Sequence, residues 1–306
     1  MAWFLLFTPT QRLGTGIAMK LARAVSLSGL CIAVGAVSSS ALAAVFQLDS
    51  FAVTKNGNVV FLDPFSDGVP PPSAPNFIDG PASYNVFGSP GPEVGGLLTL
   101  NTANGGLTAN AIGAPRRTIR VALDTNTRTE PEFLGRGLKI DDTLKLDGLF
   151  NLGVPAGPQL NGYGIRFSDR PMQNNGIVGQ TAELDVLFDP ITGQARLRWL
   201  FQDFENNSAT TIGEIPLAAP LDADQILLEI ARPDLDSNLF YASYRFLDGG
   251  VDIGGGSFAS GIALFDGENF VRAEFIAFQS VPEPSVISLV VFGLMVGAGL
   301  ARRRRH

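Results

Sequence analysis

Short runs of alternating apolar and polar residues dominate the chain after residue 118, and they limit what it can fold into. Gly, Asn, Asp and Pro separate each run from the next, which is the pattern of β-strands joined by tight turns. Few windows show a helical period. The chain is therefore predicted to be all-β, with two antiparallel sheets packed as a sandwich. The clearest runs are 118–123, 164–167, 182–188, 195–201, 225–230, 240–246 and 271–278.

Turn residues predict two hairpins within this pattern. Asn56 and Gly57 suit a two-residue type I′ turn, because both central positions of that turn need a positive φ. The segment 189–194, with Pro early and Gly late, predicts a turn between the runs 182–188 and 195–201. Both turns join neighbouring antiparallel strands.

Two other segments are predicted to be loops. The segment 64–96 is dense in proline, which cannot donate a backbone hydrogen bond to a sheet, so it predicts a long surface loop or a partly ordered insert. The segment 248–256 is dense in glycine, but no lysine and no helix follow it. It therefore predicts a flexible loop between strands rather than a phosphate cradle.

The N-terminal residues 1–43 predict a secretory signal peptide. Basic residues precede an uncharged apolar run from 24 to 37, and Ala41 and Ala43 supply the small side chains that signal peptidase needs. We expect export across an inner membrane by the Sec machinery, cleavage by signal peptidase, and a mature chain that begins at Ala44.

Three alternatives for these residues stay open. A start at Met19 gives a well-proportioned signal peptide and makes residues 1–18 an upstream artefact. The stretch 24–43 could instead form a buried or retained membrane helix, although its apolar run is shorter than a membrane span. Cys31 could mark a lipoprotein signal, although the residues before it match that signal poorly.

The C-terminal segment 282–306 has three consecutive parts: a breaker with two prolines, an uncharged apolar stretch and a basic end. At about 1.5 Å rise per residue, a transmembrane helix over 285–301 is roughly 25 Å long, which makes it a short span. An arginine run holds such an end on the cytoplasmic side of a membrane. The breaker is Pro282, Glu283 and Pro284, and the basic end is Arg302, Arg303, Arg304 and Arg305.

This tail resembles the PEP-CTERM sorting signal of Gram-negative envelope and exopolysaccharide proteins, in which Pro-Glu-Pro precedes a short span and a basic end. The resemblance covers 282–306 and no more. It implies recognition by an exosortase, a membrane-embedded cysteine protease or transpeptidase that cleaves near the Pro-Glu-Pro. It also implies transient anchoring in the membrane, followed by a place at the cell surface or in the extracellular matrix.

The remaining residues, 44–281, form an acidic domain without cysteine or histidine. The chain has 22 Lys and Arg and 29 Asp and Glu; three basic residues precede residue 44, and four arginines and one glutamate follow residue 281, which leaves a net charge of −13. Such a surface repels nucleic acid and attracts divalent cations. Because Cys31 and His306 lie outside the domain, disulfides, thiol catalysis, histidine-bound metals and Ser-His-Asp triads are excluded from it.

The order of 147–150, 162–167 and a last strand before the tail loosely resembles concanavalin-type sandwiches. The resemblance implies a jelly-roll or concanavalin-like sandwich. It carries no diagnostic motif, so fold analogy alone supports it.

Glu183 and Asp185 are the strongest catalytic candidates. Laminarinase-type glycoside hydrolases place Glu-x-Asp-x-x-Glu on one strand, where the first glutamate attacks the sugar and the last protonates the leaving group. Here the last position is Phe188, so the acid is missing. No catalytic residue is therefore assigned, and the two carboxylates are predicted to lie on a solvated strand face.

Asp234, Asp236 and Asn238 have the oxygen-ligand spacing that opens calcium loops. An EF-hand is excluded, because Leu239 and Arg245 stand where it needs glycine and glutamate. An irregular calcium site that also uses Asp222 and Asp224 remains an alternative, and calcium is the single cofactor considered. The alternative is a pair of Asp-capped turns.

Three functions are consistent with these features. The first is an exported, exosortase-sorted envelope or exopolysaccharide-associated protein with a non-catalytic structural or binding domain. The second is a carbohydrate-binding protein or a glycoside hydrolase that uses carboxylates alone, and the third is an adhesive surface protein without a small ligand. Aromatic residues that could stack on sugars or belong to the core are Tyr163, Trp199, Tyr241 and Tyr244.

Overall fold

The computed structural model describes residues 43–75, 83–124, 138–139, 142–153, 159–168, 179–264 and 270–281. Most of the predicted signal peptide, including Ala41, lies outside these residues, and so does the predicted sorting tail from residue 282 onward. Within the described part of the chain, no helix has the length and apolar character needed to cross a bilayer.

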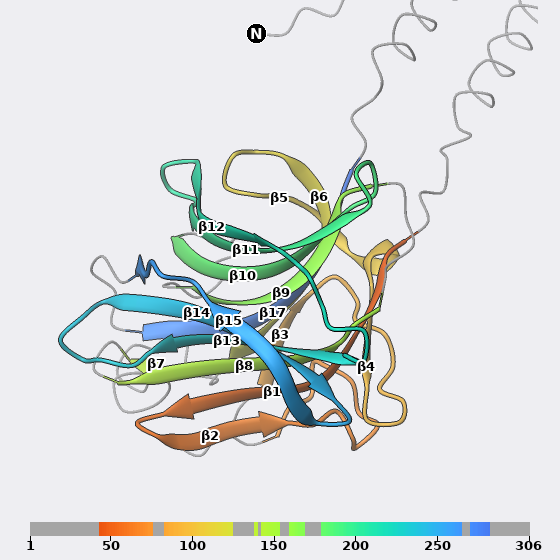
Figure 1. Ribbon diagram of the computed structural model, residues 1–306, viewed down its shortest axis with the longest axis horizontal. Coiled ribbons are helices and arrows are strands. Elements are labelled where there is room, and N and C mark those ends of the chain that lie inside the picture. The colour runs from red at the N-terminus through yellow and green to blue at the C-terminus, as the bar shows by residue number, and fades with distance from the viewer. Residues whose placement is uncertain are drawn as a thin grey trace, which may run out of the picture. The chain divides into compact units, whose positions relative to one another are not determined.

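The described residues form two antiparallel sheets that pack as a β-sandwich (Figure 1), which confirms the all-β prediction. The smaller sheet has eight strands in the order β15-β14-β13-β8-β1-β2, with β16 paired to β14 and β4 to β1. These strands are β15 (Val251–Ser257), β14 (Leu239–Asp248), β13 (Gln225–Arg232), β8 (Leu144–Asn151), β1 (Val45–Lys55), β2 (Asn58–Asp63), β16 (Ile262–Ala263) and β4 (Leu98–Asn101). A turn of 3₁₀ helix, η1 (Thr102–Asn104), follows β4.

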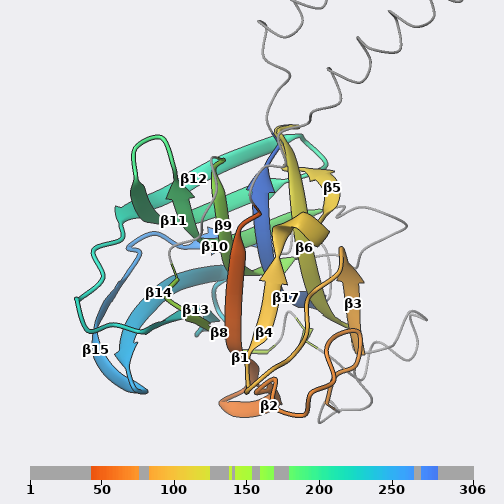
Figure 2. The ribbon, with the colours of Figure 1, turned by 90° about the vertical axis from the view of Figure 1, so that its right-hand side faces the viewer.

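The larger sheet has nine strands in the order β12-β11-β10-β9-β17-β6-β3, with β5 paired to β6 and β7 to β17. Figure 2 shows the long strand β6 with β5 beside one end and β3 beside the other. These strands are β12 (Ser208–Pro216), β11 (Gln194–Asp203), β10 (Gln180–Asp189), β9 (Asn161–Ser168), β17 (Phe270–Ser280), β6 (Pro115–Asp124), β3 (Ser83–Phe87), β5 (Gly106–Ala109) and β7 (Leu138–Lys139).

Both predicted hairpins and all seven predicted strand runs are confirmed. Asn56 and Gly57 form the turn between β1 and β2 with φ values of 50° and 79°, as a type I′ turn requires. β10 and β11 pair antiparallel across the turn at residues 190–193. The predicted runs correspond to β6, β9, β10, β11, β13, β14 and β17.

Aromatic side chains join the two sheets in the core. Alternate residues of each strand point inward, and β8 accordingly alternates between buried and half-buried residues. The ring of Tyr163 on β9 lies 5.0 Å from that of Phe46 on β1 and 4.5 Å from that of Phe150 on β8. Phe275 on β17 lies 5.0 Å from Phe51 on β1. The centre of the sandwich is therefore packed by side chains from both sheets.

Both loop predictions are wrong in part, since each segment contributes a strand. Residues 83–87 of the proline-rich segment form β3, which has no proline of its own and pairs with β6. Residues 251–256 of the glycine-rich segment belong to β15 at the edge of the smaller sheet. Gly249 and Gly250, both at positive φ, make the turn that leads into β15. Glycine thus supplies the turn, and backbone pairing with β14 holds the edge strand.

The start of β1 and the end of β17 are fastened to each other. The backbone N–H of Ala44, which is fully buried, donates to Thr102 Oγ1 at 3.0 Å and to Gln279 Oε1 at 3.4 Å. The Thr102 hydroxyl in turn donates to Gln279 Oε1 at 2.8 Å. We call these three residues the terminal clasp. It brings together the two ends of the chain segment that forms the sandwich.

Candidate functional site

The outer face of the larger sheet, opposite the core, carries a group of buried charged side chains. Because strand residues alternate between faces, Glu183 and Asp185 on β10 point away from the core, which Leu184 faces. The strand register pairs Arg166 on β9 with Glu183 on one side and with Glu274 on the other. We call the following residues the buried charge network: Arg116, Arg120, Arg166, Glu183, Asp185, Arg198, Arg272 and Glu274.

Arg166 is the centre of the buried charge network. Its side chain is 1% exposed, and its Nη2 lies 2.6 Å from Glu274 Oε2 while its Nη1 lies 3.2 Å from Glu183 Oε2. On the neighbouring strand, Arg198 Nη2 lies 2.6 Å from Asp185 Oδ2. Each of the three carboxylates thus has an arginine partner.

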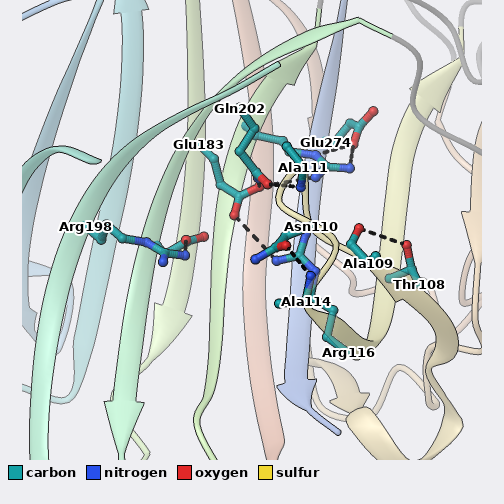
Figure 3. Close-up of polar contacts among 12 residues, drawn as sticks. Thr108, Ala109, Asn110, Ala111, Ala114, Arg116, Glu183, Arg198, Gln202 and Glu274 are labelled. Carbon is teal, nitrogen blue, oxygen red and sulfur yellow. Dashed lines mark hydrogen bonds and ion pairs between the residues drawn. The ribbon is translucent and has the colours of Figure 1, made fainter. Parts of the chain in front are cut away.

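A loop folds over part of this network (Figure 3). Gln202 on β11 donates from Nε2 to Glu183 Oε2 at 3.0 Å, and its Oε1 accepts the backbone N–H of Ala111 at 3.2 Å. Ala111 belongs to the loop between β5 and β6, which Asn110 closes by accepting the N–H of Ala114 at 2.9 Å. Since β6 and β11 are four strand positions apart, the loop crosses the outer face of the sheet.

The surrounding charges set the pKa values of the carboxylates. Burial alone would raise the pKa of Glu183, but Arg116 and Arg166 outweigh it and leave that pKa below its ordinary value. Burial would likewise raise the pKa of Glu274, but the charge of Arg166 is the main effect that outweighs it and leaves that pKa below its ordinary value. Burial and the neighbouring charge of Glu183 raise the pKa of Asp185 well above its ordinary value, with Arg198 opposing. Glu183 and Glu274 are therefore held as carboxylates.

The prediction that Glu183 and Asp185 lie on a solvated strand face is wrong, because both are fully buried. Their arginine partners come from other strands, and of these pairs Asp185 with Arg198 lies across a hairpin that the sequence predicts. A usable signal does exist, because arginines and acids recur at strand spacing. Arg196 and Arg198 flank Leu197, just as Glu183 and Asp185 flank Leu184 on the strand before.

A core residue, Phe188, stands at the position where laminarinase-type glycoside hydrolases have their general acid. Phe188 has its ring 6.3 Å from that of Phe46 and 6.1 Å from that of Tyr163. It therefore faces the sandwich interior, away from Glu183. Neither this position nor the charged carboxylates of Glu183 and Glu274 supply the general acid that glycoside hydrolysis needs. Asp185 has a raised pKa, but its side chain is fully buried and paired with Arg198.

Gly164 on β9 makes room for the buried charge network. A Cβ at this position would overlap Leu184 O and would lie 2.8 Å from Asp185 Oδ1. We expect Gly164→Ala to lower the free energy of unfolding by about 1–3 kcal/mol, because backbone and a paired carboxylate would both have to move. Urea unfolding measures this. Gly153→Ala is the matched control, since nothing lies within 4 Å of its Cβ; equal losses in the two variants contradict the prediction.

The turn that contains the candidate calcium ligands is held by hydrogen bonds from an arginine side chain. Buried Arg232 donates from Nε to Ser237 O at 2.9 Å and from Nη2 to Leu235 O at 3.3 Å, so its guanidinium occupies carbonyl oxygens that a cation would use. Asp234 Oδ1 accepts the N–H of Asp236 at 2.9 Å, as in an Asx turn. Among the described residues, no group of three or more His, Cys, Asp or Glu could hold a metal ion.

A second buried carboxylate group lies beside β2 and β3. Asp63 Oδ1 accepts the N–H of Phe65 and its Oδ2 accepts the Tyr84 hydroxyl, both at 2.9 Å. Glu93 is close by and is 7% exposed. Burial raises the pKa of Glu93 to about 7, and the neighbouring carboxylates of Asp67 and Asp63 act in the same direction. Glu93 therefore favours its protonated form in the folded protein.

The raised pKa of Glu93 predicts a loss of stability with rising pH. The folded protein binds this proton more tightly than the unfolded chain, whose carboxyl has the ordinary pKa of 4.5. The stability that this proton contributes is therefore fully present below about pH 4.5 and is lost as the pH rises through about 7. We expect Glu93→Gln to match the wild type in stability near pH 4 and to exceed it by about 1 kcal/mol at pH 8. Denaturant unfolding at several pH values checks this, and parallel pH profiles contradict it.

The aromatic candidates do not form a sugar-binding platform. Tyr163 and Trp199 are fully buried, and Trp199 Nε1 donates to Ser260 O at 3.1 Å. Tyr244 is half-buried and packs against the core, and Tyr241 is 37% exposed. A hollow of about 540 Å³ lies beside the turn between β10 and β11, but none of its described lining residues is aromatic.

No family model, curated protein or solved structure matches the chain. The candidate site therefore rests on the geometry of the described residues. The buried charge network is its most developed feature, and it is built for holding charges in fixed pairs.

Proposed function

We propose that the protein is exported, sorted by an exosortase and retained in the cell envelope or with exopolysaccharide, where its sandwich has a non-catalytic structural or binding role. The two terminal segments support the route, since one resembles a signal peptide and the other a PEP-CTERM tail. We further infer that the sandwich is of the jelly-roll or concanavalin-like kind, which its two large packed antiparallel sheets support.

One observation carries the non-catalytic role: the candidate nucleophile Glu183 is fully buried, paired with Arg166 and covered through Gln202 by the loop at Ala111. A hydrolase needs two carboxyl groups on either side of a substrate bond, one of them protonated. Here the arginines hold the network carboxylates Glu183 and Glu274 in the charged form. Strongly fixed buried charges favour a rigid domain over a reactive one.

The terminal clasp supports the proposed processing at both ends. Ala44, the predicted mature N-terminus, already lies against Thr102 Oγ1 and Gln279 Oε1. Cleavage before Ala44 would leave an amine with two oxygen acceptors in place, and cleavage near Pro282 would leave Gln279 inside the fold. Both cuts would thus spare the strands β1 and β17.

Mass spectrometry of the protein purified from a Gram-negative host with an exosortase tests the route. We expect a mature chain that begins at Ala44 and lacks the four arginines from Arg302 to Arg305. A double variant, Pro282→Ala with Pro284→Ala, should keep the arginines, because the recognition motif is gone. Retention of Arg302 to Arg305 by the wild-type protein in that host contradicts the proposal.

Assays of the secreted protein test the non-catalytic role. Incubation with exopolysaccharide should give co-sedimentation or no interaction, and no release of reducing sugar. Release of reducing sugar that is lost in Glu183→Gln but kept in Glu214→Gln would instead establish a glycoside hydrolase. Glu214 is a suitable control because its ion pair with Arg196 lies at the surface.

A further inference from the structure

Three loops with exposed apolar side chains lie at the end of the sandwich from which the chain leaves it. β17 ends at Ser280, and the next residue, Val281, donates its backbone N–H to Pro115 O at 3.2 Å. The predicted sorting tail begins directly afterwards. The loops are those at 110–114, 190–193 and 217–224.

The loop 110–114 begins and ends beside this exit. Ala109 and Pro115, which flank it, lie opposite each other in the pairing of β5 with β6. Ile112, in the middle of the loop, is 63% exposed. The loop has no charged residue. An uncharged loop with an exposed aliphatic side chain therefore lies next to the point where the chain leaves the sandwich.

The turn 190–193 lies at the same end of the larger sheet. β10 and β17 both pair with β9, and Phe188 and Gln279 lie opposite the same residue, Asn161. The turn that follows β10 is therefore two strand spacings, or about 10 Å, from the end of β17. Its Ile191 is 92% exposed, and none of its four residues is charged.

The loop 217–224 starts beside this turn. The backbone N–H of Leu217 donates to Ala195 O at 2.9 Å, in the strand that follows the turn. Leu221 is fully exposed, and residues 217–221 carry no charge. The domain 44–281 has a net charge of −13, so uncharged loops with exposed aliphatic side chains are unlike most of its surface. Single exposed apolar residues are common, but here three lie around one exit.

A membrane is within reach of this end of the sandwich. An extended chain spans at most about 3.6 Å per residue, so the five residues 281–285 reach no more than about 18 Å before the predicted span starts at Val286. While that span is inserted, the end of the sandwich that holds Val281 stays within this distance of the bilayer surface. The three loops share that end.

We propose that Ile112, Ile191 and Leu221 insert into the surface of the bilayer that holds the sorting tail. The inference rests on the proposed function, since it needs the tail to enter the membrane. Aliphatic side chains are stabilised at the boundary between headgroups and acyl chains, and uncharged loops avoid the repulsion between anionic lipids and an acidic domain. The predicted span is short, so these contacts add to a weak anchor. Removal of the tail leaves the loops alone, and the sandwich then leaves the membrane.

The fluorescence of a label on the turn 190–193 tests the proposal in protein that keeps its tail. A Gram-negative host without an exosortase supplies this protein. Without the predicted signal peptide the chain has no cysteine, so Ile191→Cys takes a single nitrobenzoxadiazole label. In vesicles of phosphatidylethanolamine and phosphatidylglycerol we expect the emission to rise about twofold or more, because the label leaves water for the interface. Spin-labelled lipid should quench it.

Leu235→Cys is the matched control, because Leu235 is an exposed leucine at the other end of β13 from the loop 217–224. β13 has eight residues, which separates the two ends by about 25 Å. A label at position 235 should stay in water. Replacing the other two side chains, by Ile112→Ser with Leu221→Ser, should reduce the quenching at position 191 by at least half.

A label on Val290→Cys, in the predicted span, reports separately on the tail. Quenching at position 290 without quenching at 191 overturns the inference and leaves the proposed anchoring intact, whereas no quenching at either position contradicts the anchoring and the inference with it. Equal quenching at 191 and 235 also overturns the inference, because no end of the sandwich is then preferred. An emission rise that needs host membranes and is absent in pure vesicles assigns the loops to a protein partner, and it overturns the proposal as well.

Discussion

Replacing Arg166 with methionine should lower the free energy of unfolding by about 3–5 kcal/mol, because the change leaves two buried carboxylates without their shared partner. Arg166 lies within 3.2 Å of both Glu183 and Glu274 and is 1% exposed. Urea unfolding followed by the fluorescence of buried Trp199 measures the loss. Arg245→Met is the matched control: its pair with Asp252 is 3.9 Å long and half-exposed, so we expect a loss below about 1 kcal/mol.

The loss in Arg166→Met should also depend on pH. Glu183 and Glu274 have lowered pKa values in the folded wild-type protein, so they stabilise it above the ordinary value of 4.5, and this contribution disappears as the pH falls below that value. The variant has lost this contribution at neutral pH and can regain stability when the carboxyl groups protonate. The difference between the two proteins should therefore shrink toward acid. An equal difference at pH 4 and pH 8 contradicts the ion-pair explanation.

Replacing Phe275 with alanine should also lower the free energy of unfolding by about 3–5 kcal/mol, because the change removes a buried apolar side chain. Phe275 is fully buried, and its ring lies 5.0 Å from that of Phe51, 5.9 Å from that of Phe65 and 5.9 Å from that of Tyr84. Its removal leaves a cavity between the two sheets and the segment after β2. The loss should not change with pH, in contrast to that of Arg166→Met.

The control for Phe275→Ala is a large apolar residue at the surface. Leu221 is fully exposed, so Leu221→Ala should change the free energy of unfolding by less than about 0.5 kcal/mol. A loss in Phe275→Ala below about 1 kcal/mol would show that the aromatic cluster collapses around the gap or is not packed as described.

The sequence predicts the strands well because strand formation here is a local property. The alternation in 195–201 places Leu197 and Trp199 in the core, and the Asn56-Gly57 turn has a conformation that few residue pairs adopt easily. The strand β3 was missed because prolines on both sides of 83–87 hid a short proline-free run.

The buried charge network could be predicted only in part: Asp185 and Arg198 lie opposite each other in the predicted hairpin, but the pair at its centre joins residues far apart in the chain. Arg166 and Glu274 are separated by 108 residues, and strand order alone brings them together. A charged residue on an alternating strand normally faces solvent, which is why the carboxylates of Glu183 and Asp185 were expected there. These carboxylates are buried instead, because a loop covers the outer face of the larger sheet and arginines of neighbouring strands pair with them.

The position of β17 has a mechanical consequence. This last strand is not at an edge: it pairs with β9 on one side and with β6 on the other, and it ends at Ser280, directly before the predicted sorting tail. A pull on the tail would therefore act along the strand and strain both rows of hydrogen bonds at once, because these bonds run across the pull rather than along it. A domain tethered through such a strand would withstand shear at a cell surface better than one tethered through an edge strand, which would peel away one bond at a time.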